Sequence, residues 1–181
     1  MDDRSALGLS IQRIRPADSG LLQQLRGQAL REAPLAFGET LAVHEARPPL
    51  YFVQAAVRQA LSGYSTTFFV HRGRLPVGMI GAYVGSESSA RGYVGALWVG
   101  SGYRRLGAGG LLVNTAGDWL FDAGVLELCA WIAPGNSQAV GFYDRLGFTA
   151  GSVIEPAPPP PSANDRVFAR QRPATWPPES S

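Results

Sequence analysis

The sequence predicts a single α+β domain built on a mixed β-sheet. The chain has 181 residues, of which 45% are hydrophobic and 17% charged, enough for one sizeable core. Runs with the period-2 pattern of strands alternate along the chain with runs of helical period. Two helical runs stop at a glycine and are followed by an apolar run. We expect about seven strands flanked by about four helices in one domain over residues 9–172, with flexible termini at 1–8 and 173–181.

The N-terminal half is predicted to contain four strands and two helices. Leucines recur at helical spacing after a helix start at Asp18 or Ser19, and Pro34 ends that helix. Residues 35–50 have the composition of a loop, and a shorter helix is expected at 51–61. The predicted strands are residues 9–14, 66–71, 76–84 and 93–99, the second and third of which form a hairpin.

The C-terminal half is predicted to alternate helices and strands. A helix over residues 107–123 stops at Gly124, and Asn136 or Ser137 caps a further helix that ends before Gly147. A run of four prolines is expected to form a stiff loop. An edge strand at residues 166–170 could pair with a second copy, so the chain is expected to be a monomer or a homodimer. The predicted strands are residues 126–132, 148–154 and 166–170.

Composition excludes several classes of protein. The formal net charge is +2 and the basic residues are scattered, so we expect no nucleic-acid partner. Apolar runs fall short of the roughly 18 residues needed to cross a bilayer, and the acidic N-terminus is unlike a signal peptide. We therefore expect a cytoplasmic protein with no membrane partner. The single cysteine, Cys129, excludes an intrachain disulfide and a cysteine-based zinc site, and we expect no metal.

The segment 101–112 predicts an anion-binding site. It joins the strand at 93–99 to a helix through a turn that carries Arg104, Arg105 and several glycines. The first amides of a helix have no internal partner and the helix dipole is positive there, so a phosphate can bind without a metal. A nucleotide-binding loop is not expected, because Gly-Lys-Ser/Thr is absent and Leu112 stands where a dinucleotide fingerprint needs its third glycine.

Two motifs in this half of the chain resemble the signatures of the GNAT superfamily of acyl-CoA-dependent N-acetyltransferases. The first follows the pattern Arg-x-x-Gly-x-Gly in residues 99–112, although Ser101 and Gly102 stand where relatives often have a proline and an acidic residue. The second lies in residues 136–148 and occurs in family order and spacing. The matching positions are Arg104, Gly107, Gly109, Asn136, Ala139, Phe142, Tyr143, Leu146, Gly147 and Phe148.

The resemblance implies a GNAT fold and acetyl-CoA as the donor. It assigns the pantetheine arm to strand backbone groups, as in the addition of a strand, and the pyrophosphate to the amides at the start of the following helix. Asn136 would cap the last helix and bond the cofactor, although capping alone would explain it. Tyr143 would act as the general acid for the thiolate, with core packing as the alternative. The implied cofactor-binding residues are Leu97, Trp98, Val99, Arg104, Arg105, Leu106, Gly107, Ala108, Gly109, Gly110, Asn136 and Tyr143.

The acceptor and the general base are less determined. Phe37, Glu39, Tyr83 and Trp98 could line a pocket for a small-molecule or peptide amine, and core packing is the alternative for the three aromatic residues. Relatives often carry a glutamate on the strand at 93–99, where this chain has none. The alternative function is therefore an acyl-CoA-binding regulatory module that has lost turnover.

The remaining candidates for the base lie elsewhere in the chain. Glu39 and Glu45 are in the loop that lines the acceptor side in relatives, and Glu127 begins the next strand, where solvent or a salt partner is expected. His44 and His71 are expected at the surface. Water relayed to backbone carbonyls is a further route for the proton.

Overall fold

The computed structural model describes residues 8–34, 37–85, 90–151, 165–174 and 176. In this part of the chain seven strands form one mixed sheet in the order β1-β2-β3-β4-β5-β7-β6. The strands are β1 (Leu9–Arg13), β2 (Ser65–Arg72), β3 (Leu75–Val84), β4 (Arg91–Val99), β5 (Glu127–Ile132), β6 (Thr149–Ala150) and β7 (Arg166–Gln171). The α-helices are α1 (Ser19–Glu32), α2 (Leu41–Glu45), α3 (Pro49–Leu61), α4 (Ala108–Asp122) and α5 (Ser137–Asp144), with short 3-10 helices at η1 (Pro16–Asp18) and η3 (Ser101–Tyr103).

The predicted mixed sheet is confirmed. β4 and β5 pair in parallel, and the other neighbouring strands pair antiparallel. The crossover between the parallel strands is α4, which begins after Gly107 and ends before Gly124, both with positive φ. These two glycines therefore set the ends of the helix, as the sequence predicts.

Two details of the prediction are wrong. Residues 41–45, expected as loop, form α2, because the Thr40 hydroxyl caps a helix too short to show a period in the sequence. The strand at 166–170 was expected at an edge of the sheet, but β7 lies between β5 and β6, and β6 occupies the edge. Of the strand predicted at 148–154, residues 149–150 form β6, while residues 152–154 and the proline run lie outside the described residues.

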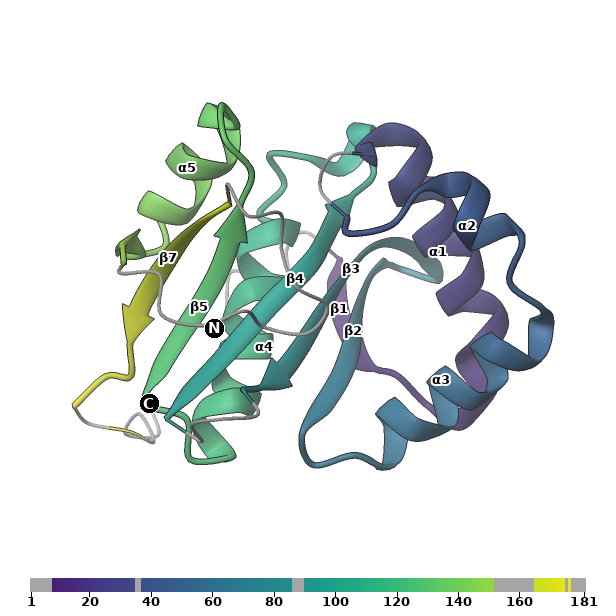
Figure 1. Ribbon diagram of the computed structural model, residues 1–181, viewed down its shortest axis with the longest axis horizontal. Helices are drawn as coiled ribbons and strands as arrows, with labels where there is room; N and C mark the ends of the chain where they lie inside the picture. Colours follow the sequence, from purple (N-terminus) through teal and green to yellow (C-terminus); the bar gives the residue numbers. More distant parts are fainter. Residues whose placement is uncertain (1–7, 35–36, 86–89, 152–164, 175, 177–181) are drawn as a thin grey trace.

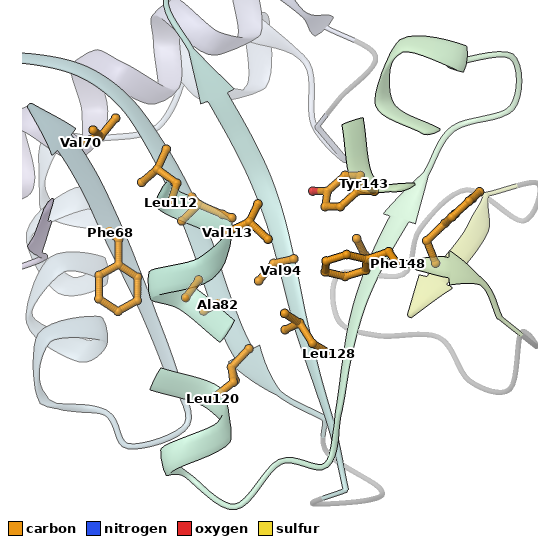
Figure 2. Close-up of a cluster of buried hydrophobic side chains, with 14 of the residues drawn as sticks. Phe68, Val70, Ala82, Val94, Leu112, Val113, Leu120, Leu128, Tyr143 and Phe148 are labelled. Carbon is orange, nitrogen blue, oxygen red and sulfur yellow. The ribbon is translucent and has the colours of Figure 1, made fainter. Parts of the chain in front are cut away.

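Helices cover the two faces of the sheet (Figure 1). α4 and α5 pack on one face, where the main cluster of buried side chains includes Val94, Leu112, Leu120 and Leu128 (Figure 2). α1 and α3 pack on the other face over β2 and β3, with Phe52 and Met79 in a second cluster. The site described below lies where the first cluster ends, at the carboxyl ends of β4 and β5.

In the C-terminal stretch, Trp176 contacts α4. Trp176 packs on Phe121, with ring centroids 5.3 Å apart, and its indole N–H donates to Asp122 (3.1 Å), so this residue is docked on α4. No helix in the described part of the chain has the length and apolar character needed to cross a bilayer.

Candidate active site

A gap opens between β4 and β5. The parallel ladder joins residues 91–94 to residues 127–130 and ends at the pair Val94 and Ala130. Beyond it the two strands diverge toward their carboxyl ends (Figure 1). Among the described strands the last part of β4 is therefore paired only with β3, and its other edge has no strand partner.

A β-bulge begins the gap. Between the pairs Gly81–Gly95 and Met79–Trp98, β4 has one more residue than β3, and Ala96 adopts a φ of 52°. Such a conformation is strained for a residue with a Cβ and is tolerated only where the surroundings hold it. The bulge bends β4 away from β5 and thereby creates the divergence.

The register decides which backbone groups face this gap. The Gly100 amide donates to Val77 on β3 (2.9 Å), and the Trp98 carbonyl also lies close to β3, against Gly78. Because backbone groups alternate along a strand, Leu97 and Val99 turn toward the gap. Of the three positions named from the sequence, Leu97 and Val99 therefore turn their backbone groups toward the gap, where the Val99 carbonyl already accepts from Arg104 Nε (2.9 Å), and Trp98 does not.

The turn after β4 ends on the N-terminus of α4. The amides of Ala108, Gly109 and Gly110 have no carbonyl one turn back within the helix, and Leu111 is the first whose amide does, on the Gly107 carbonyl (3.0 Å). The N-cap residue, Gly107, has a φ of 80° and no side chain that could cap these amides. Unpaired donors at the positive end of a 15-residue helix can bind an anion.

The two arginines of the turn differ in their surroundings. The Nε of Arg104 donates to the Val99 carbonyl (2.9 Å), and its Nη2 pairs with Glu32 at the end of α1 (3.2 Å). Arg105 is exposed and takes a φ of 71°, and its guanidinium makes no ion pair within the described residues. Only Arg105 is therefore free to turn toward an anion without breaking an existing contact.

α5 brings the second predicted motif to the same gap. Asn136 caps this helix, because its side-chain oxygen accepts from the Ala139 amide (3.0 Å). Tyr143 is buried, with its ring edge to face with those of Phe142 and Phe148. Figure 2 shows its hydroxyl on the side directed toward β4 and α4. Burial raises the pKa of this phenol, so it stays protonated and able to donate across the neutral range.

Gly109 allows α4 to approach α5. A Cβ at this position would lie 3.3 Å from two ring atoms of Phe142 and 4.0 Å from the Val99 side chain. At Gly110 the nearest atom is Leu146 Cδ2 at 3.6 Å, an ordinary contact. A side chain is therefore sterically restricted at Gly109 and accommodated at Gly110, so the two neighbouring glycines can be compared directly.

We expect Gly109→Val to weaken coenzyme A binding about tenfold, a loss of roughly 1.4 kcal/mol. The added methyl groups would displace Phe142 and narrow the approach to the helix amides. Isothermal titration calorimetry measures the effect, with Gly110→Ala as the control, which should bind within about twofold of the wild type. Equal affinities for Gly109→Val and the wild type would contradict the position assigned to the anion.

The acceptor-side residues named from the sequence do not form one group. Trp98 is buried in the cluster beneath α1 and α3, and Phe37 packs against the same cluster. Tyr83 instead stacks on Tyr93, with centroids 5.5 Å apart, in a separate cluster with Cys129, the buried thiol that the sequence predicts. Burial raises the pKa of the Tyr83 phenol. The structure thus brings Phe37 and Trp98 together and leaves Tyr83 apart.

The carboxylates considered as a general base are all ion-paired. Glu39 is buried between Arg26 and Arg47, and despite its burial these arginines hold its pKa below the ordinary value. Glu45 pairs with Arg31 (2.8 Å) at the surface. Glu127 pairs with Arg91 (2.6 Å), which confirms the expected salt partner. Because Glu39 is held in its charged form by two cations, it is a weak proton acceptor.

The prediction that His44 lies at the surface is wrong. The residue is on α2, which the sequence did not reveal, and its ring is 3% exposed against Phe52. Its Nε2 donates to the Gln23 carbonyl (3.1 Å), while its Nδ1 has no hydrogen-bond partner among the residues that the structure describes and lies 4.0 Å from Glu39. His71 is half-buried on β2, and its pKa is lowered by burial.

Stability is expected to fall below about pH 6.5 because of His44. Burial lowers the pKa of His44 in the folded state. Glu39 tends to raise this pKa, and the positive charges of Arg26 and Arg47 tend to lower it. The unfolded chain then binds a proton at higher pH than the folded chain, so the contribution is complete above the unfolded pKa and is lost as the pH falls. The loss is at most about 1.4 kcal/mol per pH unit. Melting temperatures at pH 7.5 and 5.5 should differ less in His44→Gln than in the wild type; an equal difference would exclude His44.

Two residues of the candidate site were not predicted from the sequence. Ala96 carries the bulge, and Glu32 accepts from both Trp98 and Arg104. The absence of a regular alternation over residues 95–97 was the only available signal for the bulge. The sequence around Glu32 gives no sign of its role, because its partners lie 66 and 72 residues away in the chain. Within the described residues no cluster of three or more potential metal ligands is found.

The divergent strands, the uncapped N-terminus of α4 and the buried phenol of Tyr143 lie in one region of the fold. A model of the GNAT acetyltransferase family matches residues 28–148. The chain belongs to this family of acyltransferases, as the sequence motifs predicted. Among curated proteins, none matches the chain with significant similarity.

Solved structures show the same fold at low sequence identity. A GNAT acetyltransferase from Streptococcus pneumoniae is 19% identical, with a TM-score of 0.70, and the match covers 91% of this chain and 99% of that one. The PaiA N-acetyltransferase of Thermoplasma acidophilum, solved with coenzyme A, is 14% identical (TM-score 0.70, 91% and 99% covered). The acetyltransferase YncA of Salmonella typhimurium, solved with acetyl-CoA, is 14% identical (TM-score 0.69, 96% and 99% covered).

Proposed function

We propose that this protein transfers the acetyl group of acetyl-CoA to a primary amine of a small molecule or a peptide. The observation that carries the proposal is that the gap between β4 and β5 leads to unpaired helix amides at one end and lies beside Tyr143. A pantetheine arm pairs as a strand, a diphosphate needs clustered amide donors, and a leaving thiolate needs an acid. Relatives solved with coenzyme A and acetyl-CoA share the fold and support the choice of donor.

Each part of the chain has one task in this reaction. The backbone groups of Leu97 and the amide of Val99 hold the pantetheine arm, and the amides at the start of α4 hold the diphosphate. The amine nitrogen attacks the thioester carbonyl, the C–S bond breaks, and the Tyr143 hydroxyl gives its proton to the departing sulfur. The attacking nitrogen loses a proton to water, because the carboxylates of Glu39, Glu45 and Glu127 are held by arginines.

A panel of amines tests the proposal. The protein is incubated with acetyl-CoA and small polyamines, amino acids, aromatic amines or peptides, while free thiol is followed and products are identified by mass. Amine-dependent thiol release with an acetylated product supports the enzyme. Coenzyme A binding without turnover on any amine would instead favour the regulatory module, and the absence of binding would exclude both.

A further inference from the structure

Glu32 connects three parts of the candidate site that are distant in the sequence. Its Oε2 accepts from the indole Nε1 of Trp98 (3.3 Å) and from Nη2 of Arg104 (3.2 Å). The same guanidinium donates through Nε to the Val99 carbonyl (2.9 Å). We call this set, formed by Glu32, Trp98, Arg104 and the Val99 carbonyl, the Glu32 brace.

The brace constrains the elements that would hold the cofactor. Arg104 is the first residue after η3, and two of its donor groups are already used by α1 and β4. Val99 is one of the two positions whose backbone faces the gap, and its carbonyl is held by the same guanidinium. The end of β4, the turn and the end of α1 are therefore linked through one planar group with fixed donor geometry.

The brace works through geometry more than through its energy. The side chains of Arg104 and Glu32 are 46% and 40% exposed, and ion pairs at such positions contribute little to stability. The other oxygen of Glu32, Oε1, has no hydrogen-bond partner among the described residues. A contact that hardly stabilises the fold, yet connects three elements of the site, fits a role in positioning.

We propose that Arg104 is a positioning residue, held by the Glu32 oxygen that also accepts from Trp98, and that it shapes the backbone of the cofactor gap without contacting the diphosphate. The exposed Arg105 then supplies the cationic side chain for phosphate. This inference rests on the proposed function for the identity of the ligand. The brace itself can be tested without any ligand.

The first experiment examines the brace in the free protein. The indole N–H resonance of Trp98, assigned with Trp98→Phe, is compared in ¹H–¹⁵N spectra of the full chain. Glu32→Gln and Arg104→Gln should both displace it, because the first changes the acceptor of the indole N–H and the second removes the other donor to that same oxygen. Arg31→Gln, which removes an exposed ion pair on the same helix, is the control and should leave it in place. An unmoved resonance in Arg104→Gln would overturn the brace.

The second experiment separates positioning from phosphate contact. Dissociation constants are measured for coenzyme A and for pantetheine, which lacks the diphosphate. Glu32→Gln and Arg104→Gln should each weaken both ligands by about fivefold, the range of an exposed pair, and the double variant should be no weaker than either single one. Arg105→Gln should weaken coenzyme A alone.

The outcomes are distinguishable from failure of the proposed function. If Arg104→Gln weakens coenzyme A and spares pantetheine, or if its effect adds fully to that of Glu32→Gln, Arg104 contacts the phosphate and the inference is wrong. If the wild type binds neither ligand, the proposed function fails. In that case the Trp98 resonance alone decides whether the brace exists, and the assignment of Arg104 to positioning a cofactor gap is overturned.

Discussion

Replacing Tyr143 by phenylalanine is expected to lower kcat on the order of 100-fold while changing the affinity for coenzyme A by less than about threefold. The hydroxyl is the only group removed, and the ring contacts with Phe142 and Phe148 remain. The raised pKa keeps the phenol protonated, so the wild type always offers a proton that the variant lacks. The effect should therefore fall on turnover and leave both packing and binding nearly unchanged.

The measurement combines steady-state turnover with a binding titration. Tyr143→Phe and the wild type are compared at saturating acetyl-CoA with whichever amine the panel identifies. The melting temperature serves as the control for folding and should not change by more than about 2 °C, since no buried volume is lost. Full turnover in Tyr143→Phe would remove the phenol as the acid and leave it as a core residue.

Gly78→Ala is expected to destabilise the protein by about 2–3 kcal/mol, through overpacking against a strand that cannot move freely. A Cβ at this position would lie 2.6 Å from the Trp98 carbonyl oxygen and 3.0 Å from the Val70 side chain. The first of these atoms belongs to the backbone of β4, at the end of the strand that borders the gap. The substitution must therefore shift β4 itself.

Gly81→Ala is the matched control for this substitution. Gly81 lies on the same strand, and a Cβ there would be 3.5 Å from the Gly95 carbonyl, an ordinary contact. Thermal unfolding should show a fall of roughly 5–10 °C for Gly78→Ala and little change for Gly81→Ala. Coenzyme A affinity should fall only in the first variant, and two equal melting temperatures would contradict the close approach of β3 and β4.

Most secondary structure could be predicted because its signals are local. Glycines with positive φ end or begin the helices where the sequence places them, and Asn136 caps α5 as expected. α2 was missed because five residues are too few for a helical period to appear. The position of β7 could not be predicted, since a strand's neighbours depend on pairing between distant segments.

The candidate site was predictable to the same extent. The turn before α4 was predicted from its residues, because a helix N-terminus offers free amides whatever surrounds it, and the motif on α5 was predicted from its resemblance to the family. The acceptor side could not be predicted, because burial determines which of its side chains can meet a substrate. Trp98 lies in the core, and Glu39 is enclosed by two arginines. The sequence does not show whether a carboxylate is free or part of an ion pair.

The amino-acid sequence by itself determined the family and the mixed sheet, since the motifs and strand patterns each lie in residues close together in the chain. It also predicted an anion site at Gly107 to Gly110 and, through the family resemblance, an acid at Tyr143. Only the tertiary structure decided that β4 and β5 diverge at Ala96, that His44 is buried, and that Glu32 holds Arg104. The physical reason is the same for all three. Strand register, burial and ion pairing depend on atoms that meet only after the sheet and its helices have packed.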